Sequence, residues 1–312
     1  MFDGILIIDK PAGITSHDVV ARCRRILKTK RIGHTGTLDP FATGVMVVLV
    51  GKATRLAQFL DKDAKEYEAT VRFGFETDTG DRTGKKKEEE KGRKGEREII
   101  KEEIEMVLKD FRGEILQTPP MFSAKKVDGK KLYELARKGI EIERKPVKLN
   151  ISQLELLELR VESFESGETD SRLSTLDSRL LVACSAGTYI RVLAEDIGKK
   201  LKTGAHLAEL RRTRAGKFGI EKSVTLEKLE ETVAENKLSE VLISTNEAVS
   251  HLKEVKLSAE EVAKIKNGVK LKRVSDQLKD GEVLRLTEGG NLLGVGFYNK
   301  AEKTVQPKLV LV

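Results

Sequence analysis

The sequence predicts an α+β fold, in which a large mixed, mainly antiparallel sheet is flanked by helices and loops and a small β-rich module follows. Two observations favour this class. Apolar strand-like runs precede and follow single helices, without the strict strand–helix–strand alternation of a parallel α/β fold. From about residue 246 the chain changes to short β-like segments separated by glycine-rich turns. We therefore expect two domains, 1–245 and 246–312.

The chain is predicted to begin with a strand, a helix, a second strand and a short helix. Residues 4–8 are apolar and mostly β-branched, and a proline-glycine turn follows them. Thr15 suits the N-terminus of a helix whose apolar side chains fall on one face over residues 19–27. Residues 45–50 form a continuous apolar run, which is typical of a buried strand, and residues 54–60 indicate a short helix.

The middle of the chain adds two strands and two helices. Residues 65–75 alternate between apolar and polar side chains, which indicates a half-buried strand. A helix is expected from about residue 98, ended by Gly113, with these side chains inward: Ile100, Ile104, Val107, Leu108 and Phe111. A strand over residues 180–185 leads through a glycine into a helix whose apolar face extends over residues 190–201.

Two stretches are too polar to be buried. Residues 84–97 are almost entirely Lys, Glu, Arg and Gly, and we expect a surface excursion there. Residues 163–178 separate two strand-like segments, which predicts a hairpin loop. In the C-terminal module a short helix is predicted over residues 258–266. Strands are predicted over residues 283–286 and 292–296, joined by a Gly-Gly hairpin, and over residues 308–312.

Composition narrows the class of partner. The 312 residues include 58 Lys and Arg against 50 Asp and Glu, a formal charge of +8. Two basic clusters lie beside the unusual loops, which favours phosphate binding over a merely solvated surface: Arg22, Arg24, Arg25, Lys28, Lys30 and Arg31, and then Lys199, Lys200, Lys202, Arg211, Arg212, Arg214 and Lys217. A polyanionic partner is therefore expected.

The cysteines, the histidines and the lack of long apolar runs argue against several classes of site and of protein. Cys23 and Cys184 are far apart and form neither a disulfide framework nor a zinc pattern. The four histidines lack metal-ligand spacing, so no metal site is expected. The sequence shows no signal peptide and no apolar span of membrane length, so we expect a cytoplasmic protein.

The most informative stretch is the glycine-rich segment 33–44, expected to be a single loop. Its three glycines allow close approach of a ligand, and Pro40 biases the preceding Asp39 toward extended backbone. The segment thus presents one carboxylate in a fixed pose. On this loop alone, Asp39 is equally well interpreted as a turn-capping residue or as a catalytic group.

Five motifs, in order over roughly the first 220 residues, closely resemble those of the TruB-type tRNA pseudouridine synthases. They are Asp9-Lys10-Pro11-x-Gly13-x-Thr15-Ser16, Gly33-His34-Thr35-Gly36-Thr37-Leu38-Asp39-Pro40, Lys65-x-Tyr67, Gln117-x-Pro119-Pro120-x-Phe122-Ser123-Ala124-x-Lys126 and Gly187-Thr188-Tyr189-Ile190-Arg191. The C-terminal module resembles the PUA domain that ends bacterial members of this family. One departure is Phe122, where the family usually has tyrosine.

The resemblance implies an isomerase that converts the uridine at position 55 in the T-loop of tRNA to pseudouridine, without a cofactor. Asp39 is then the catalytic aspartate, which attacks ribose C1′ or uracil C6, and Arg191 keeps it ionised and aimed. Tyr67 corresponds to the active-site tyrosine that stacks on the uracil. On residue type alone, the alternative for Arg191 is a surface or phosphate-contacting arginine, and a residue such as Tyr67 is more often a core aromatic.

The resemblance also implies a set of substrate-binding residues. The target uridine has to leave the stack, and His34 corresponds to the residue that fills or props the vacated space. Lys10 is expected to order the catalytic loop, Leu210 to pack on the base, and Tyr189 either to line the pocket or to be structural. For His34 the alternative is a hydrogen bond that stabilises the loop.

The expected partner is the T-arm stem-loop of tRNA, bound by a monomer with no obligate protein partner. An alternative function is that of a tRNA-binding or folding chaperone in which catalysis is secondary. A nucleotide-dependent phosphotransferase is disfavoured, because the Gly51-Lys52-Ala53-Thr54 run lacks the spacing of a phosphate-binding loop.

Overall fold

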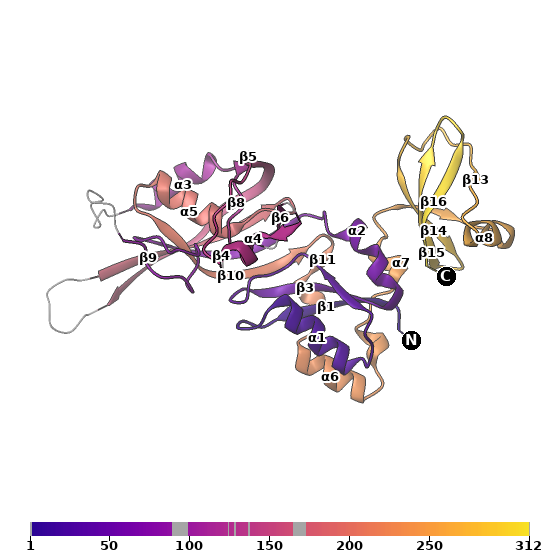
Figure 1. The fold of residues 1–312 in the computed structure, drawn as a ribbon, viewed down its shortest axis with the longest axis horizontal. Coiled ribbons are helices and arrows are strands. Elements are labelled where there is room, and N and C mark those ends of the chain that lie inside the picture. Colours follow the sequence, from indigo (N-terminus) through magenta and orange to yellow (C-terminus); the bar gives the residue numbers. More distant parts are fainter. Residues whose placement is uncertain are drawn as a thin grey trace.

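The computed structural model describes residues 2–88, 99–123, 125–127, 129–136, 138–164 and 173–311. Within these residues a nine-stranded sheet has the order β1-β3-β10-β4-β9-β8-β5, with β2 beside β3 and β11 beside β10 (Figure 1). Its strands are β1 (Gly4–Lys10), β2 (Ile32–Thr35), β3 (Thr43–Val50), β4 (Lys65–Phe73), β5 (Gly113–Gln117), β8 (Val147–Phe164), β9 (Leu173–Cys184), β10 (Ala205–Ala215) and β11 (Phe218–Gly219).

The sheet is mixed and mainly antiparallel, as the sequence predicts. The strand pairs of the large sheet are antiparallel except β3 and β10, which run parallel and align Thr43 with Arg211 and Gly44 with Arg212. This parallel contact joins the N-terminal strands to the rest of the sheet. It therefore brings the end of the glycine-rich segment beside β10.

A second sheet occupies the C-terminal part of the described chain, in the order β12-β14-β15-β16-β13. Its strands are β12 (Lys253–Lys256), β13 (Leu271–Lys272), β14 (Val283–Glu288), β15 (Asn291–Asn299) and β16 (Thr304–Val310). The predicted hairpin at Gly289-Gly290 joins β14 to β15. A small hairpin of β6 (Lys126–Val127) and β7 (Lys130–Lys131) stands apart from both sheets.

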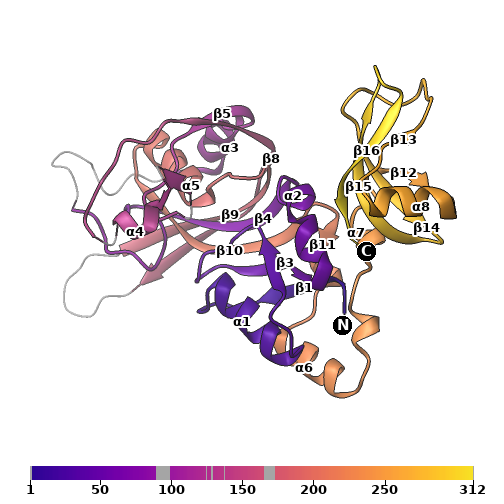
Figure 2. The same ribbon diagram turned by 45° about the vertical axis from the view of Figure 1, so that its right-hand side comes forward.

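Helices cover different parts of the large sheet. They are α1 (Ser16–Ile26), α2 (Ala57–Leu60), α3 (Lys101–Lys109), α4 (Leu132–Ala136), α5 (Ile190–Lys200), α6 (Leu226–Ala234), α7 (Thr245–Ala248) and α8 (Ala259–Lys266), with 3-10 turns over Gly51–Leu56, Ile220–Lys222 and Leu238–Glu240. Figure 2 shows α3 and α5 together at the β8–β9 end and α1 with α6 at the β1–β3 end. No helix among the described residues is both long enough and apolar enough to span a membrane.

The apolar runs of β1 and β3 are continuous because both faces of these strands are buried. Leu6 and Ile8 face α1 and α6, whereas Ile5 and Ile7 face α2 and the C-terminal sheet. That second cluster also contains the C-terminal side chains Leu292, Val295, Leu309 and Leu311. The C-terminal sheet is thus separate in its strand pairing but shares a hydrophobic cluster with the N-terminal strands.

Several boundaries differ from the sequence prediction. Residues 33–35 of the expected loop belong to β2 and pair with β3, and residues 43–44 belong to β3, so the irregular part is limited to residues 36–42. Strand β1 continues through Lys10 into the predicted turn. Helix α3 begins at Lys101, which leaves Ile100 at its N-cap and 51% exposed rather than inward.

Other differences concern the polar stretches and the glycines. Helix α3 ends at Lys109, and Gly113 instead opens β5 with a φ of +82°. Strands β8 and β9 remain paired as far as Phe164 and Leu173, so they run into the predicted hairpin loop at 163–178. The tip of that hairpin and most of the charged stretch 84–97 lie outside the described residues.

Candidate functional site

A cavity of about 410 Å³ lies where the glycine-rich segment meets β4, β10 and the start of α5. Six of the seven predicted site residues line it: His34, Asp39, Tyr67, Tyr189, Arg191 and Leu210. Lys10 does not line the cavity. Residues far apart in the sequence therefore converge because β3 and β10 are neighbours and α5 packs on the same face of the sheet as Tyr67.

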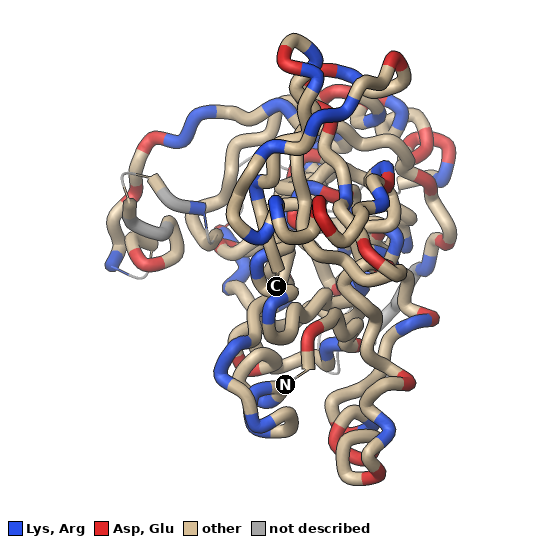
Figure 3. The backbone as a smooth tube through the Cα atoms, turned by 90° about the vertical axis from the view of Figure 1, so that its right-hand side faces the viewer, with Lys and Arg blue, Asp and Glu red and all other residues tan. Residues whose placement is uncertain are grey.

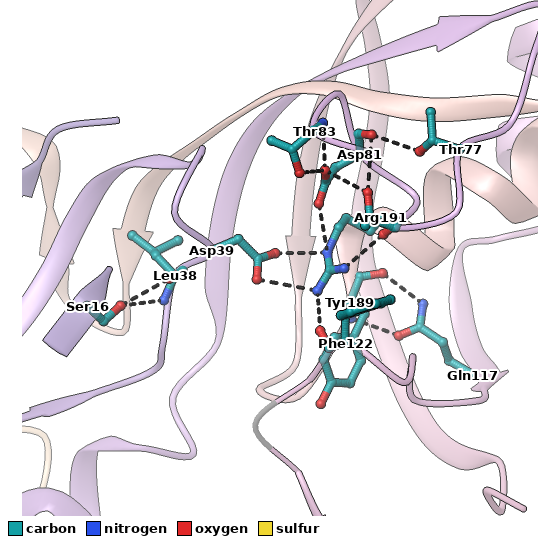
Figure 4. A network of polar contacts seen from close by, with 11 residues as sticks. Ser16, Leu38, Asp39, Thr77, Asp81, Thr83, Gln117, Phe122, Tyr189 and Arg191 are labelled. Carbon is teal, nitrogen blue, oxygen red and sulfur yellow. Dashed lines mark hydrogen bonds and ion pairs between the residues drawn. The ribbon is translucent and has the colours of Figure 1, made fainter. Parts of the chain in front are cut away.

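The central feature of the cavity is a two-point ion pair (Figure 4). Arg191 donates from Nε to Oδ2 of Asp39 at 2.9 Å and from Nη2 to Oδ1 at 3.3 Å. Arg191 is almost fully buried, whereas the side chain of Asp39 is 34% exposed. A planar guanidinium that grips both oxygens fixes the orientation of the carboxylate while leaving one side of it open to the cavity.

Arg191 is itself held from three further directions. Its Nη1 donates to Thr79 O at 2.9 Å and its Nη2 donates to Phe122 O at 2.8 Å. Its Nε also lies 3.8 Å from the buried carboxylate of Asp81. Asp81 accepts hydrogen bonds from Thr83 N at 2.9 Å and Thr83 Oγ1 at 2.6 Å, so its position is fixed too (Figure 4).

The electrostatics of Asp39 follow from this setting. Desolvation in the cavity wall raises the pKa of Asp39 above the usual 3.8, the Arg191 cation opposes the rise, and the nearby Asp81 anion adds to it. The arrangement gives a carboxylate that is less solvated than a free one and is held beside a permanent cation. Such a group is suited to nucleophilic or general-base chemistry.

The loop that carries Asp39 is pinned on both sides of that residue. Ser16, at the start of α1, accepts a hydrogen bond from Leu38 N at 2.9 Å and donates to Leu38 O at 3.1 Å. Thr15 caps the same helix in a capping box with Asp18. The N-terminus of α1 therefore holds the backbone next to the carboxylate.

Lys10 anchors the other side of the loop. It is completely buried, and its Nζ donates to the carbonyl oxygens of Pro11 at 2.9 Å, Pro40 at 3.1 Å and Ala42 at 2.7 Å. Burial lowers the pKa of Lys10 from 10.5 to about 8, although the Asp39 charge opposes that shift. The contacts of Lys10 are thus with backbone carbonyls of the loop and not with the cavity.

Gly44 is required where the loop rejoins the sheet. Its φ is +100°, and a Cβ at this position would lie 2.2 Å from the backbone oxygen of Arg212. Only a glycine lets β3 approach β10 this closely. The approach places Leu210 and Arg212 of β10 in the cavity wall.

Tyr67 lies on β4 directly opposite Arg212 of β10 and is buried. Desolvation raises the pKa of the Tyr67 phenol, while the nearby Arg212 charge opposes the rise. The phenol is therefore protonated at neutral pH. Arg212 is 1% exposed and also donates to Val45 O at 2.6 Å and Gly36 O at 2.9 Å, so one side chain links Tyr67 to the glycine-rich segment.

His34 and Tyr189 both line the cavity. Desolvation lowers the pKa of His34, which keeps its imidazole neutral, and the ring packs edge-on against His17 at 5.8 Å between centroids. Tyr189 N donates to Gln117 Oε1 at 2.8 Å, and Gln117 Nε2 donates to Tyr189 O at 3.1 Å. Gln117 thus fixes the backbone from which α5 begins.

The two basic clusters do not form two uniform surfaces. Arg212 points into the cavity wall and Arg211 pairs with Asp9 at 2.8 Å on the opposite face of β10. Lys200 pairs with Asp110 and Arg22 with Glu227. Viewed from the C-terminal end, Figure 3 shows Lys and Arg interspersed with Asp and Glu along the chain.

Sequence reasoning assigned no role to three residues at this site, which are Ser123, Gln117 and Asp81. It placed Arg212 in a phosphate-binding cluster, but this side chain is 1% exposed and is part of the cavity wall. A signal for Asp81 existed in the run of Thr, Asp and Gly over residues 77–84, which is typical of a tight polar turn. Among the described residues, no group of three or more His, Cys, Asp or Glu side chains is placed to hold a metal ion.

Three family domains match consecutive parts of the chain. They are the TruB family pseudouridylate synthase N-terminal domain at residues 24–190, the tRNA pseudouridylate synthase B C-terminal domain at 191–250, and the pseudouridine synthase II TruB C-terminal domain at 254–311. Together they span most of the chain and include both Asp39 and Arg191.

Curated relatives of the chain belong to the same family. The chain is 42% identical over 296 residues to tRNA pseudouridine synthase B of Solibacter usitatus, covering 94% of this chain and 95% of the relative. It is 45% identical over 286 residues to the protein of that name from Geobacillus thermodenitrificans, covering 91% of each.

Among solved structures, one described as a Cbf5-Nop10-Gar1 complex is similar, with a TM-score of 0.73 and 28% identity over 99% of this chain and 85% of the other. A structure of an H/ACA RNP bound to a substrate RNA containing 2′-deoxyuridine matches with a TM-score of 0.71 and 26% identity, covering 99% of this chain and 85% of the other. The predicted large mixed sheet with flanking helices is therefore the pseudouridine synthase fold.

Proposed function

Because the chain belongs to the TruB family of pseudouridine synthases, we propose that it acts on the uridine at position 55 in the T-loop of tRNA. That it is a tRNA pseudouridine synthase, and hence an isomerase, follows from its curated relatives. The reaction breaks the bond between ribose C1′ and uracil N1, rotates the base and joins C1′ to C5. N1 gains a proton and C5 loses one, so the isomerisation is redox-neutral.

In this proposal Asp39 is the catalytic carboxylate. The single observation that carries it is the two-point grip of Arg191, which leaves the open side of Asp39 facing the cavity. A carboxylate in this position is able to attack an electron-poor sugar carbon or the uracil C6. Arg191 keeps the carboxylate ionised despite the desolvation that raises its pKa.

The remaining cavity residues are proposed to hold the flipped base. A uracil is flat and largely apolar on its faces, and Tyr67 and Leu210 offer a ring and a branched aliphatic side chain. The neutral ring of His34 is suited to occupy the space that the flipped base vacates. Tyr189 is proposed as a further wall of the pocket, and Lys10 as a residue that positions the Asp39 loop.

We further propose a catalytic domain over 1–245 and a PUA-like RNA-binding domain over 246–312, which act together as a monomer on the T-arm. The distinct five-stranded sheet supports the division, although the shared cluster with β1 and β3 ties the two parts together. We place the enzyme in the cytoplasm. Cys23 and Cys184 are both unpaired and buried, which suits a reducing compartment.

The test is tritium release from tRNA that carries 5-tritiated uridine, because only loss of the C5 proton frees the label. Wild-type protein is expected to release tritium, and Asp39→Asn is expected to release none while still binding tRNA. Binding without release by the wild type would instead favour a tRNA-folding chaperone. Release by Asp39→Asn equal to that of the wild type would remove Asp39 from the chemistry.

A further inference from the structure

Two buried cations beside Tyr67 have no role in the chemistry described so far. Arg212 is 1% exposed and Lys65 is 6% exposed, and both line the cavity that contains Asp39. Within the described part of the chain, both side chains bind backbone oxygens and neither forms an ion pair with a carboxylate. A buried charge without a counter-charge destabilises a protein, so two of them in one cavity wall indicate that the cavity receives a negatively charged group.

Both cations are fixed in place by the carbonyl groups that they bind. Arg212 donates from Nε to Val45 O at 2.6 Å and from Nη2 to Gly36 O at 2.9 Å. Lys65 donates from Nζ to two backbone oxygens, one of which is Asp61 O at 2.9 Å. Carbonyl oxygens satisfy the donors but leave the positive charges in the wall.

The two charges are close enough to affect each other and Tyr67. Burial lowers the pKa of Lys65, and the Arg212 charge lowers it further. The carboxylates of Asp63 and Asp61 oppose these two effects. Burial raises the pKa of Tyr67, and the Arg212 charge opposes that rise. The cations therefore favour negative charge in this part of the cavity.

The sheet register places these charges beside the proposed site of the base. Arg212 lies directly opposite Tyr67 in the pair of β4 and β10, so the two side chains share one face of the sheet, with their Cβ atoms about 5 Å apart. Lys65 lies two residues before Tyr67, and Leu210 two residues before Arg212, so they lie on the same face. Since Tyr67 and Leu210 are proposed to hold the uracil, both cations lie next to the base.

We propose that the cations of Arg212 and Lys65 stabilise the negative charge that the uracil ring gains when its bond to ribose C1′ breaks. This inference rests on the proposed function, because it takes a flipped uridine as the ligand. The electron pair of the C1′–N1 bond leaves with N1, and the charge spreads over N1, O2 and O4 until C5 joins C1′. Attack of Asp39 at C6 also places negative charge on the ring. A fixed cation acts on this charge through the low-dielectric wall without touching the base, so a buried guanidinium is suited to the role.

The experiment measures how strongly the site favours an anionic uracil ring. The probe is a T-arm stem-loop RNA with 5-fluorouridine at the target position, bound to Asp39→Asn so that no reaction occurs. Fluorine makes the N3 proton more acidic than that of uridine, and its loss leaves a ring anion with the charge on O2 and O4. The fluorine NMR shift, followed against pH, gives the pKa of N3. We expect a lower pKa of N3 in the bound RNA than in the free RNA.

Removing either cation is expected to reverse this effect. Arg212→Met and Lys65→Met, each combined with Asp39→Asn, should decrease the acid dissociation constant of N3 in the bound RNA about tenfold. The two variants lose different backbone contacts and have only the loss of a charge in common. Arg212→Lys should keep the constant of the parent protein, because the charge remains although the guanidinium contacts are lost.

Arg211→Met is the matched control. Arg211 is adjacent to Arg212 on β10, but its side chain lies on the opposite face of the sheet and pairs with Asp9 at 2.8 Å. This variant removes one positive charge from the same strand without changing the cavity wall. It should therefore leave the acid dissociation constant of N3 unchanged.

A pKa of N3 in the bound RNA equal to or above that in the free RNA would overturn the proposal without any further variant. An unchanged constant in Arg212→Met or in Lys65→Met, or an equal decrease in Arg211→Met, would overturn it as well. The proposed function is tested separately by pseudouridine formation from the uridine RNA by the wild type. Activity without the expected change in pKa refutes the inference about the two cations alone, whereas absence of activity refutes the function on which it rests.

Discussion

The buried ammonium group of Lys10 gives the most direct physical prediction. Its pKa falls from 10.5 to about 8 in the folded protein, and the difference corresponds to about 3 kcal/mol. Between these two pH values the unfolded chain holds a proton that the folded chain has released. The unfolded state then binds more protons, so this group makes the folded protein more stable as pH rises from 8 to 10.5.

The perturbation is Lys10→Met, which has a similar length and no charge. The free energy of unfolding, measured by urea titration at several pH values, should increase by about 3 kcal/mol more in the wild type than in Lys10→Met between pH 8 and 10.5. Lys62→Met, at an exposed position, is the control and should follow the wild type. Parallel curves for wild type and Lys10→Met would refute the assignment of a depressed pKa to Lys10.

The pH dependence of enzymatic activity should also reflect the ionisation of Lys10. The charged Lys10 holds the carbonyls of Pro40 and Ala42, which follow Asp39 in its loop, and loss of its proton removes one of three donated hydrogen bonds. We expect kcat/KM to fall as pH rises through about 8, because the loop is then held less well. In Lys10→Met this decline should be missing and kcat reduced about 100-fold at every pH, since a small displacement of a catalytic group is costly.

Three further predictions follow from the geometry. On the acidic side of its pH profile, kcat/KM should fall at a pH above 3.8, the usual pKa of aspartate, because the pKa of Asp39 is raised. Asp81→Asn should move this fall to lower pH, since the Asp81 anion helps to raise the pKa of Asp39, and an unmoved profile would contradict this coupling. Gly44→Ala should destabilise the fold by about 3 kcal/mol through its clash with Arg212 O, whereas Gly281→Ala, also at positive φ but in open space, should cost about 1 kcal/mol in chemical denaturation. Leu309→Ala should lower the free energy of unfolding by about 2–5 kcal/mol. Because Leu309 shares a hydrophobic cluster with Ile5 and Ile7, the variant should melt at a lower temperature in a single calorimetric transition. Two separate transitions would show that the C-terminal sheet unfolds by itself.

The hydrophobic periodicity of the sequence predicted those elements that bury only one of their faces. The alternation of β4 and the apolar face of α5 are both visible in the sequence, because each element has one face in the core and one outside it. Strand β2 is different. Gly33 and His34 do not favour a strand, and these residues pair only because β3 offers its edge along residues 47–50.

The second basic cluster shows what charge counting misses. Arg211 and Arg212 are adjacent in the sequence, but they lie on a strand, so their side chains point to opposite faces of the sheet. Arg211 reaches Asp9, whereas Arg212 enters the cavity wall and binds Val45 O and Gly36 O. Their separation follows once β10 is recognised as a strand, and the sequence reading assigned none there.

Two site residues whose roles the sequence did not indicate, Gln117 and Arg212, have backbone groups as partners. Gln117 binds both backbone polar groups of Tyr189, and Arg212 binds two carbonyl oxygens. A side chain that binds backbone has no required residue type opposite it, so no pairing pattern is visible in the sequence. The motifs identified the catalytic pair of Asp39 and Arg191, and the supporting contacts required the fold.

These backbone contacts also explain how the cavity retains positive charge. Lys10, Lys65, Arg191 and Arg212 are all buried beside Asp39 or its loop, and each donates to carbonyl oxygens. Carbonyls satisfy these donors without neutralising the cations, and Arg191 pairs in addition with the Asp39 carboxylate. The charges of Arg191 and Lys10 favour the ionised form of Asp39 against the desolvation that raises its pKa. The same four side chains tie separate loops together, so the rigidity of the site and its electrostatic potential arise from one set of interactions.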